Sequence, residues 1–136
     1  MTIALISDIH ANLPALEAVM KDIGDRLPDA VYCLGDLVGY NVWPNEVIEQ
    51  IRKRRIATLA GNHDLKVRDI LPDAKSYAYN IVHEHHKKYL LSLPAHILLE
   101  YGEDDDKFNM LFVHGSPRSV NEYLLEDLTN RICFRS

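Results

Sequence analysis

Cysteine is scarce in this sequence, and its scarcity excludes two classes of protein. Cys33 and Cys133 are the only two cysteines in 136 residues, and their separation is unlike that of a metal-binding pair. Cys33 lies within an apolar run and is predicted to be a core residue, so neither a disulfide framework nor a thiolate metal centre is expected.

Long apolar runs are missing as well. None approaches the roughly 20 residues that a membrane-spanning helix requires, so no membrane partner is expected. Met1 leads directly into the first apolar run, which favours a chain without a signal peptide. With so few cysteines, the sequence therefore predicts a cytoplasmic protein.

Basic residues are fewer than acidic residues in this sequence. Fifteen Lys and Arg residues face 20 Asp and Glu residues, and the net charge of −5 excludes strong binding of the whole molecule to nucleic acid. The basic run Arg52–Arg55 is interpreted as a complement to a helix C-terminus, with a polyanion-binding patch as the alternative. The apolar content of 47% and charged content of 26% are typical of a globular protein, and a single domain over residues 1–136 is expected.

The sequence does contain four short apolar runs that each end in residues able to bind a metal ion. These are Ile3–Ser7 before Asp8 and His10, Ala30–Leu34 before Asp36, Ile56–Ala60 before Asn62, His63 and Asp64, and Met110–Val113 before His114. Short aliphatic runs bounded by Gly, Asp and Asn predict buried strands. Ligands of open sheets gather beyond the carboxyl ends of such strands, so the four endings are expected to form one site.

The residue types suit a pair of divalent cations. Asp8 and His10 are two residues apart, so on a chain that leaves a strand in extended form their side chains point the same way and can share an ion. Asp36 has two carboxylate oxygens and can bridge two ions, and Gly35 beside it lets the backbone approach closely. Carboxylate, imidazole and amide ligands together match Mn, Fe, Zn or Ni.

In this order the motifs resemble those of the calcineurin-like metallophosphoesterases. The resemblance runs along the whole chain and is especially close to a prokaryotic branch related to diadenosine tetraphosphatases and small phosphodiesterases. The stretches that carry it are Ser7–Leu13, Leu34–Tyr40, Gly61–Asp64 and Val113–Arg118. It implies an α/β fold in which a β-sandwich is flanked by helices and begins with a βαβαβ unit.

The resemblance also implies the metal ligands. Asp8 and His10 would hold the first of two divalent ions, Asn62 and His114 would hold the second, and Asp36 would bridge them. Manganese is the favoured metal among Mn, Fe, Zn and Ni.

Catalytic and substrate-binding roles follow in the same way. His63 would donate a proton to the leaving oxygen or steady the phosphate, and Asp64 would orient its ring, since a carboxylate beside a histidine fixes its tautomer. Asn62 and His63 would contact the substrate, a phosphomonoester, phosphodiester or nucleotide. Arg118 is expected either to pair with substrate oxygens or to form a surface salt bridge.

The sequence departs from the family pattern at its C-terminal end. The pattern closes with a Gly-His-x-His element on a later strand, and no histidine follows His114 here. We therefore expect an incomplete domain, either because the protein continues beyond Ser136 or because the chain is naturally short. The expected function is two-metal activation of water for phosphoester hydrolysis. The alternative is a non-catalytic metal-binding module that keeps the fold and is completed by a partner chain, for example in a homo-oligomer.

Between the strands the pattern predicts helices and a hairpin. Helices are expected from Leu13 to Gly24, from Pro44 through Ile51, from Tyr77 through Lys88 with an end at Pro94, and over Asn121–Ser136. Ile97–Tyr101 and Phe108–Val113 are expected to form a hairpin around the acidic turn Gly102–Asp106, for which a calcium loop is the alternative.

Two further groups have more than one interpretation. His83, His85 and His86 are read either as a polar helix face or lid, or as replacements for the missing histidines, since His83 and His86 would share a helical face. Tyr40 and Trp43 are expected either to line the substrate cleft or to form a hydrophobic staple for the second helix.

Overall fold

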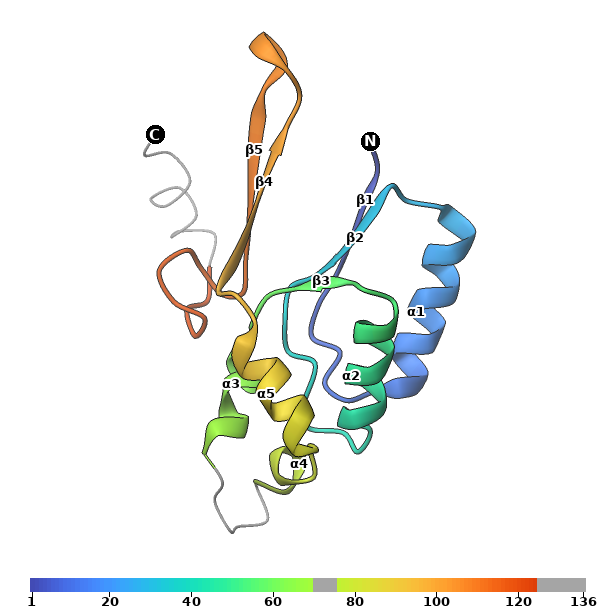
Figure 1. Cartoon of the computed structure of the whole chain (residues 1–136), viewed down its shortest axis with the longest axis vertical. Coiled ribbons are helices and arrows are strands. Elements are labelled where there is room, and N and C mark those ends of the chain that lie inside the picture. Colours follow the sequence, from blue (N-terminus) through green and yellow to red (C-terminus); the bar gives the residue numbers. More distant parts are fainter. Residues whose placement is uncertain (70–75, 125–136) are drawn as a thin grey trace.

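The computed structural model describes residues 1–69 and 76–124 of the chain (Figure 1). Three parallel strands form a sheet in the order β1-β2-β3, and each pair is joined by a helix. The elements are β1 (Ile3–Ile6), α1 (Leu13–Arg26), β2 (Ala30–Cys33), α2 (Pro44–Lys53) and β3 (Ala57–Thr58). The predicted βαβαβ start and the α/β class are therefore confirmed.

A second sheet is the antiparallel hairpin of β4 (His96–Tyr101) and β5 (Phe108–Val113), in which Leu98 faces Leu111. It follows the predicted hairpin within one residue. Figure 1 shows the hairpin beside β1 and β2, with α1 and α2 beyond them. The ring of Phe112 lies 5.4 Å from that of Tyr32 on β2, which brings the two sheets into contact.

Helix α1 begins as predicted and ends later. The side chain of Asn12 accepts a hydrogen bond from the N–H of Ala15 at 3.1 Å and so caps the helix. The predicted end at Gly24 is wrong, because the helix continues to Arg26 and closes with Leu27 at a φ of 49°. A single glycine lowers helix propensity by about 1 kcal/mol, which does not end a helix whose apolar face is packed.

The single helix predicted from Tyr77 to Pro94 is also wrong. The chain forms α4 (Tyr77–Asn80) and α5 (Glu84–Ser92), separated by His83 in an extended conformation with a ψ of 147°. Asn45 on α2 holds this break: its side chain donates to the carbonyl of Ile81 at 2.9 Å and accepts from the N–H of His83 at 2.8 Å. A tertiary contact therefore overrides the local helical pattern.

The core lies between the parallel sheet and the helices. It is formed by buried apolar side chains of α1, β2, the loop after β2, α2, α5 and neighbouring segments, namely Leu16, Cys33, Leu37, Val38, Val47, Ile48, Ile51, Ile56, Val67, Val82 and Leu90. The burial of Cys33 agrees with its predicted place in the core. None of the helices that the structure describes is long and apolar enough to cross a membrane.

The last predicted helix, Asn121–Ser136, falls largely outside the described residues. Residues 121–124 are not helical. Residues 125–136, with Cys133, are not described.

Candidate metal centre

Two loops at the carboxyl ends of β1 and β2 form the base of the site. They are joined by backbone hydrogen bonds, from the N–H of Asp8 to Gly35 O at 3.0 Å and from the N–H of His10 to Asp36 O at 2.9 Å. Asp8, His10 and Asp36 all have positive φ, at 55°, 47° and 59°. Such strained backbone persists only where the surrounding contacts determine it, and it is typical of functional sites.

Two glycines let a third loop, which precedes α3 (Asn62–Leu65), reach the first two. A Cβ on Gly61 would collide with the carboxylate and the backbone nitrogen of Asp36, and a Cβ on Gly35 would collide with the backbone of Gly61. Gly35 also has a φ of 93°, which glycine adopts without strain. The two glycines therefore set the depth at which the Asp36 side chain lies.

Gly61→Ala is expected to lower the free energy of unfolding by about 1–3 kcal/mol, as overpacking does. It should also weaken metal binding, because the added methyl group displaces the Asp36 carboxylate. Urea unfolding and calorimetric titration with Mn(II) measure the two effects. Gly24→Ala is the matched control: a Cβ there meets no atom within 4 Å, and helix propensity should raise stability by up to about 1 kcal/mol. Equal Mn(II) affinity in Gly61→Ala and the parent would contradict this packing.

Asp64 is fully buried beneath the three loops. Its carboxylate accepts hydrogen bonds from the N–H groups of Asp36 at 2.8 Å, Leu37 at 2.8 Å and Gly61 at 2.9 Å. Burial raises the pKa of Asp64 to about 6, while these N–H donors lower it. Asp64 thus ties the loop that carries Asp36 to the start of α3.

Two histidines direct the Nε2 atom of their rings toward the site. The Nδ1–H of His10 donates to the carbonyl of Val38 at 2.9 Å, and the Nδ1–H of His114 donates to the carbonyl of Leu34 at 2.7 Å. A carbonyl can only accept, so in the neutral rings Nδ1 carries the proton and Nε2 keeps its lone pair. Backbone carbonyls commonly orient metal-binding histidines in this way.

Asp36 lies close to the Nε2 atoms of both His10 and His114 and is only 2% exposed. Its Oδ1 accepts the N–H of His63 at 2.8 Å, and its Oδ2 lies 3.6 Å from His10 Nε2 and 3.3 Å from His114 Nε2. Asp8 Oδ1 lies 3.5 Å from His10 Nε2, and Asn62 Oδ1 lies 2.9 Å from His114 Nε2. Asp36 Oδ2 thus lies near both of the predicted ligand pairs, Asp8 with His10 and Asn62 with His114.

These separations fit bound cations. Two ligands of one ion, each about 2.0–2.2 Å from it, lie about 3–3.5 Å apart. The atoms that converge around Asp36 Oδ2 are carboxylate oxygens, an amide oxygen and imidazole nitrogens whose protons are committed elsewhere. When both rings are neutral with the proton on Nδ1, all of these atoms are acceptors that repel one another, and a divalent cation removes that repulsion.

His63 is oriented by Tyr79 and not by Asp64. The hydroxyl of Tyr79 lies 2.7 Å from His63 Nδ1, whereas the Asp64 carboxylate faces backbone N–H groups. The prediction that Asp64 orients this ring is therefore wrong. Consecutive helical residues point about 100° apart, so neighbours in sequence need not touch.

Tyr79 belongs to no motif, so nothing in the sequence indicated its contact with His63. It comes from α4, 16 residues after His63, and only the packing of α4 brings it to the site. The rings of His10 and Tyr40 lie 4.8 Å and 4.9 Å from that of His63. Burial lowers the pKa of His63, against an opposing effect of the Asp36 carboxylate.

A cavity of about 470 Å³ opens over these residues. Its polar lining includes Ser7, Asp8, His10, Asp36, Tyr40, Asn62, His63, His114, Asn121, Glu122 and Tyr123. Tyr40 thus lines this cavity, in keeping with one of the two positions left open for it, whereas Trp43 is the N-terminal cap residue of α2 and is not part of the lining.

Arg118 lies outside this cavity. Its guanidinium pairs with the carboxylate of Glu122, so the surface salt bridge that the sequence left open is present. A contact between Arg118 and a substrate stays a prediction, and it would require the side chain to leave Glu122.

The sequence model of the calcineurin-like phosphoesterases matches residues 1–135. The chain belongs to this family. The expected family resemblance is thus confirmed, and the loops described above are those that carry the motifs on which it rested.

Related proteins agree with the assignment to the calcineurin-like phosphoesterases. An uncharacterized protein of Methanocaldococcus jannaschii is 36% identical over 96% of the chain and 56% of its own length. The crystal structure of a metallophosphoesterase from Sphaerobacter thermophilus is 37% identical, with a TM-score of 0.71, over 91% of this chain and 51% of that one. A protein provisionally assigned as a diadenosine tetraphosphatase shares the fold, with a TM-score of 0.58 at 18% identity over 78% of this chain and 55% of that one. The chain thus spans about half the length of these relatives.

Proposed function

We propose that this member of the calcineurin-like phosphoesterases supplies the part of a two-metal phosphoesterase active site that is centred on Asp36. The observation that carries the proposal is the convergence of acceptor atoms on Asp36 Oδ2, at 3.6 Å from His10 Nε2 and 3.3 Å from His114 Nε2. Similarity to a metallophosphoesterase over 91% of the chain supports it.

Each ion would have its own pair of ligands. Asp8 and His10 would hold the first ion, Asn62 and His114 the second, and Asp36 would bridge them. When bound, two divalent cations activate a water molecule and neutralise charge on the phosphate oxygens. Oxygen and imidazole ligands without thiolate suit manganese, which we propose as the working metal, although Fe, Zn and Ni match the same ligands.

His63 would act on the leaving group. A neutral ring that accepts the Tyr79 hydroxyl at Nδ1 carries its proton on Nε2, which is then free to donate to a substrate oxygen. Burial favours this neutral ring, since it lowers the pKa of His63. Asp64 would serve as a positioning residue through the loop of Asp36, and Asn62 would contact the substrate in addition to its ion.

The substrate is proposed to be a phosphomonoester, a phosphodiester or a nucleotide. A cavity of about 470 Å³ has room for a nucleotide-sized group beside the ions. The ring of Tyr40, at the rim and 74% exposed, offers a surface on which a base or aromatic leaving group could stack.

The remaining ligands are proposed to come from outside the 136 residues. Five ligands leave each ion short of the expected Gly-His-x-His histidines, and the chain covers only 56% and 51% of the length of two relatives. Leu98 and Leu111 pair across the hairpin and are 54% and 48% exposed. Exposed apolar side chains of this kind favour a further segment that covers this face of the hairpin. A metal-binding module completed by a second copy of the chain is the competing arrangement.

Two lengths of the protein distinguish these arrangements. The 136-residue chain is expected to show little hydrolysis of bis(p-nitrophenyl) phosphate with Mn(II), whereas a version extended by a Gly-His-x-His segment should be active. Light scattering on both reports whether the short chain self-associates. Full activity of a monomeric short chain would contradict the proposal that ligands are supplied from outside it.

A further inference from the structure

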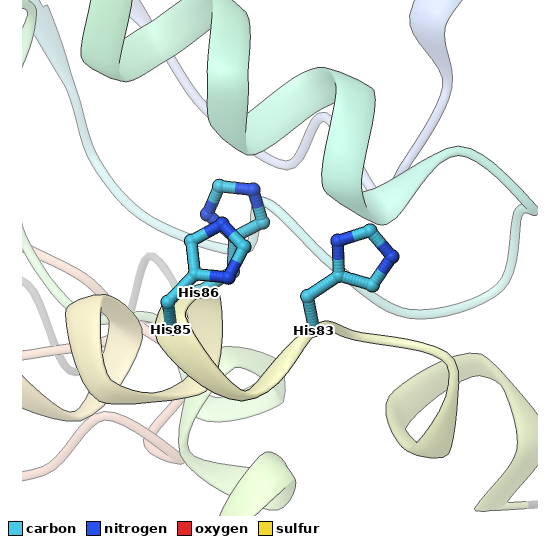
Figure 2. Close-up of side chains that lie close together, drawn as sticks. All are labelled: His83, His85 and His86. Carbon is cyan, nitrogen blue, oxygen red and sulfur yellow. The ribbon is translucent and has the colours of Figure 1, made fainter.

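A second group of potential ligands lies at the start of α5, away from the cavity. His83 caps the helix and His85 and His86 lie in its first turn, and one ring nitrogen of each lies within 4.8 Å of those of the other two. Figure 2 shows the three side chains projecting from α5 on the side that faces α2. None of the three lines the cavity around Asp36, so they do not replace its missing histidines.

The three rings lie against one another, with His86 buried and His83 and His85 exposed. The rings of His83 and His86 are nearly parallel, with 12° between their planes and 6.0 Å between their centres, and those of His85 and His86 are 4.0 Å apart. Asn45 fixes the backbone of His83 to α2 by a hydrogen bond of 2.8 Å.

A carboxylate from α2 completes the group. Glu49 Oε1 lies 3.5 Å from His86 Nε2, which is long for a hydrogen bond between these groups. It is close to the separation of about 3.3 Å expected for two ligands of one tetrahedral ion at 2.0–2.1 Å. Glu49 is exposed, so its carboxylate is free to move the remaining distance.

One contact of His86 must change when an ion binds. Arg52 can only donate, so its contact of 3.4 Å with His86 Nδ1 leaves the proton of the neutral ring on Nε2, which faces Glu49. Coordination through Nε2 therefore requires this proton to move to Nδ1 and the contact with Arg52 to be lost. Arg52 also rests over the ring of Tyr89 at 4.7 Å, and this contact remains if the long contact to His86 is lost.

We propose that His83, His85, His86 and Glu49 form a second metal site, separate from the phosphoesterase centre. Three imidazoles and one carboxylate select a borderline transition-metal ion, Zn(II) or Ni(II), over Mg(II), Ca(II) or Mn(II). The ion joins the start of α5 to α2. It therefore stabilises the break between α4 and α5 that Asn45 also holds.

The test compares the number of zinc ions bound per chain in the parent and in His83→Ala/His85→Ala. Equilibrium dialysis followed by elemental analysis should give one ion fewer in the double variant. His96→Ala, which removes an exposed histidine of β4, is the matched control and should bind as many ions as the parent. Circular dichroism of the metal-free proteins tests whether the double variant is folded, and we expect it to match the parent. Equal zinc content in the parent and a folded double variant would overturn the site.

Two further measurements test the geometry. Zinc should raise the melting temperature of the parent more than that of His83→Ala/His85→Ala, because the ion ties α2 to α5. Glu49→Gln should weaken the zinc affinity of this site by about 10-fold or more, as expected for the loss of a charged ligand. An unchanged affinity would remove Glu49 from the site.

Discussion

Replacing His63 with alanine is expected to lower the turnover of a phosphodiester by roughly 10²–10⁴-fold, the usual range for the loss of a general acid. The protein to use is the extended version that is active with Mn(II). The physical reason is the orientation of the ring: its Nδ1 is engaged by the Tyr79 hydroxyl at 2.7 Å, which leaves Nε2 to protonate the departing oxygen. The measurement is kcat on a diester with an alkyl leaving group.

The leaving group supplies the control. A nitrophenolate ion departs without a proton, so the loss of turnover in His63→Ala should be much smaller for a nitrophenyl ester. Tyr79→Phe removes only the hydroxyl at Nδ1 and should show the same dependence with a smaller loss. Metal content should remain close to that of the parent, although His63 also lies near His10 and Asp36. Loss of the ions, or an equal loss of activity on all leaving groups, would rule out the proposed role.

Asp36→Asn is expected to weaken Mn(II) binding by about 100-fold or more, since outer-shell changes already cost 10–100-fold. The asparagine oxygen can still accept the N–H of His63, but its NH₂ group then faces the lone pairs of His10 and His114. The variant should therefore fold, while the rise in melting temperature that Mn(II) gives the parent disappears.

Calorimetry and elemental analysis measure the effect of Asp36→Asn. Asp105→Asn at the tip of the hairpin is the matched control, because it removes the same charge from an exposed turn. No other single substitution among the proposed ligands should reduce uptake as much. Equal uptake by Asp36→Asn and the parent would remove Asp36 from the bridging position.

The assembly of the site could be predicted because it follows from strand geometry. The motifs of Asp8, Asp36 and Asn62 follow β1, β2 and β3, and the carboxyl ends of parallel strands meet at one edge of a sheet. The sequence also indicated the close backbone approach at Gly35. The grouping of Asp8 with His10 was expected from their spacing on an extended chain, but both residues have positive φ, so that reason was wrong. The grouping of Asn62 with His114 came from the family resemblance, and the structure places the members of each pair close together.

Contacts between distant segments could not be predicted. Tyr79 reaches His63 only through the packing of α4, and the break at His83 depends on hydrogen bonds from Asn45 on another helix. For Asp64 the sequence suggested a contact that the structure does not contain. Its place next to His63 in the sequence suggested a direct contact, whereas the turn of α3 directs its carboxylate to the backbone of the Asp36 loop.

The most direct test of the two-metal site is a count of bound Mn(II) ions. They are counted in the extended protein while its activity is followed. The metal-free protein should carry His83→Ala and His85→Ala, so that only the Asp36 cluster is counted, and Mn(II) uptake is followed by equilibrium dialysis beside hydrolysis of bis(p-nitrophenyl) phosphate. We expect two ions per chain, with hydrolysis that appears as they bind and disappears when a chelator removes them. Hydrolysis at the same rate by the metal-free protein, or no Mn(II) uptake at the Asp36 cluster, would contradict the two-metal site.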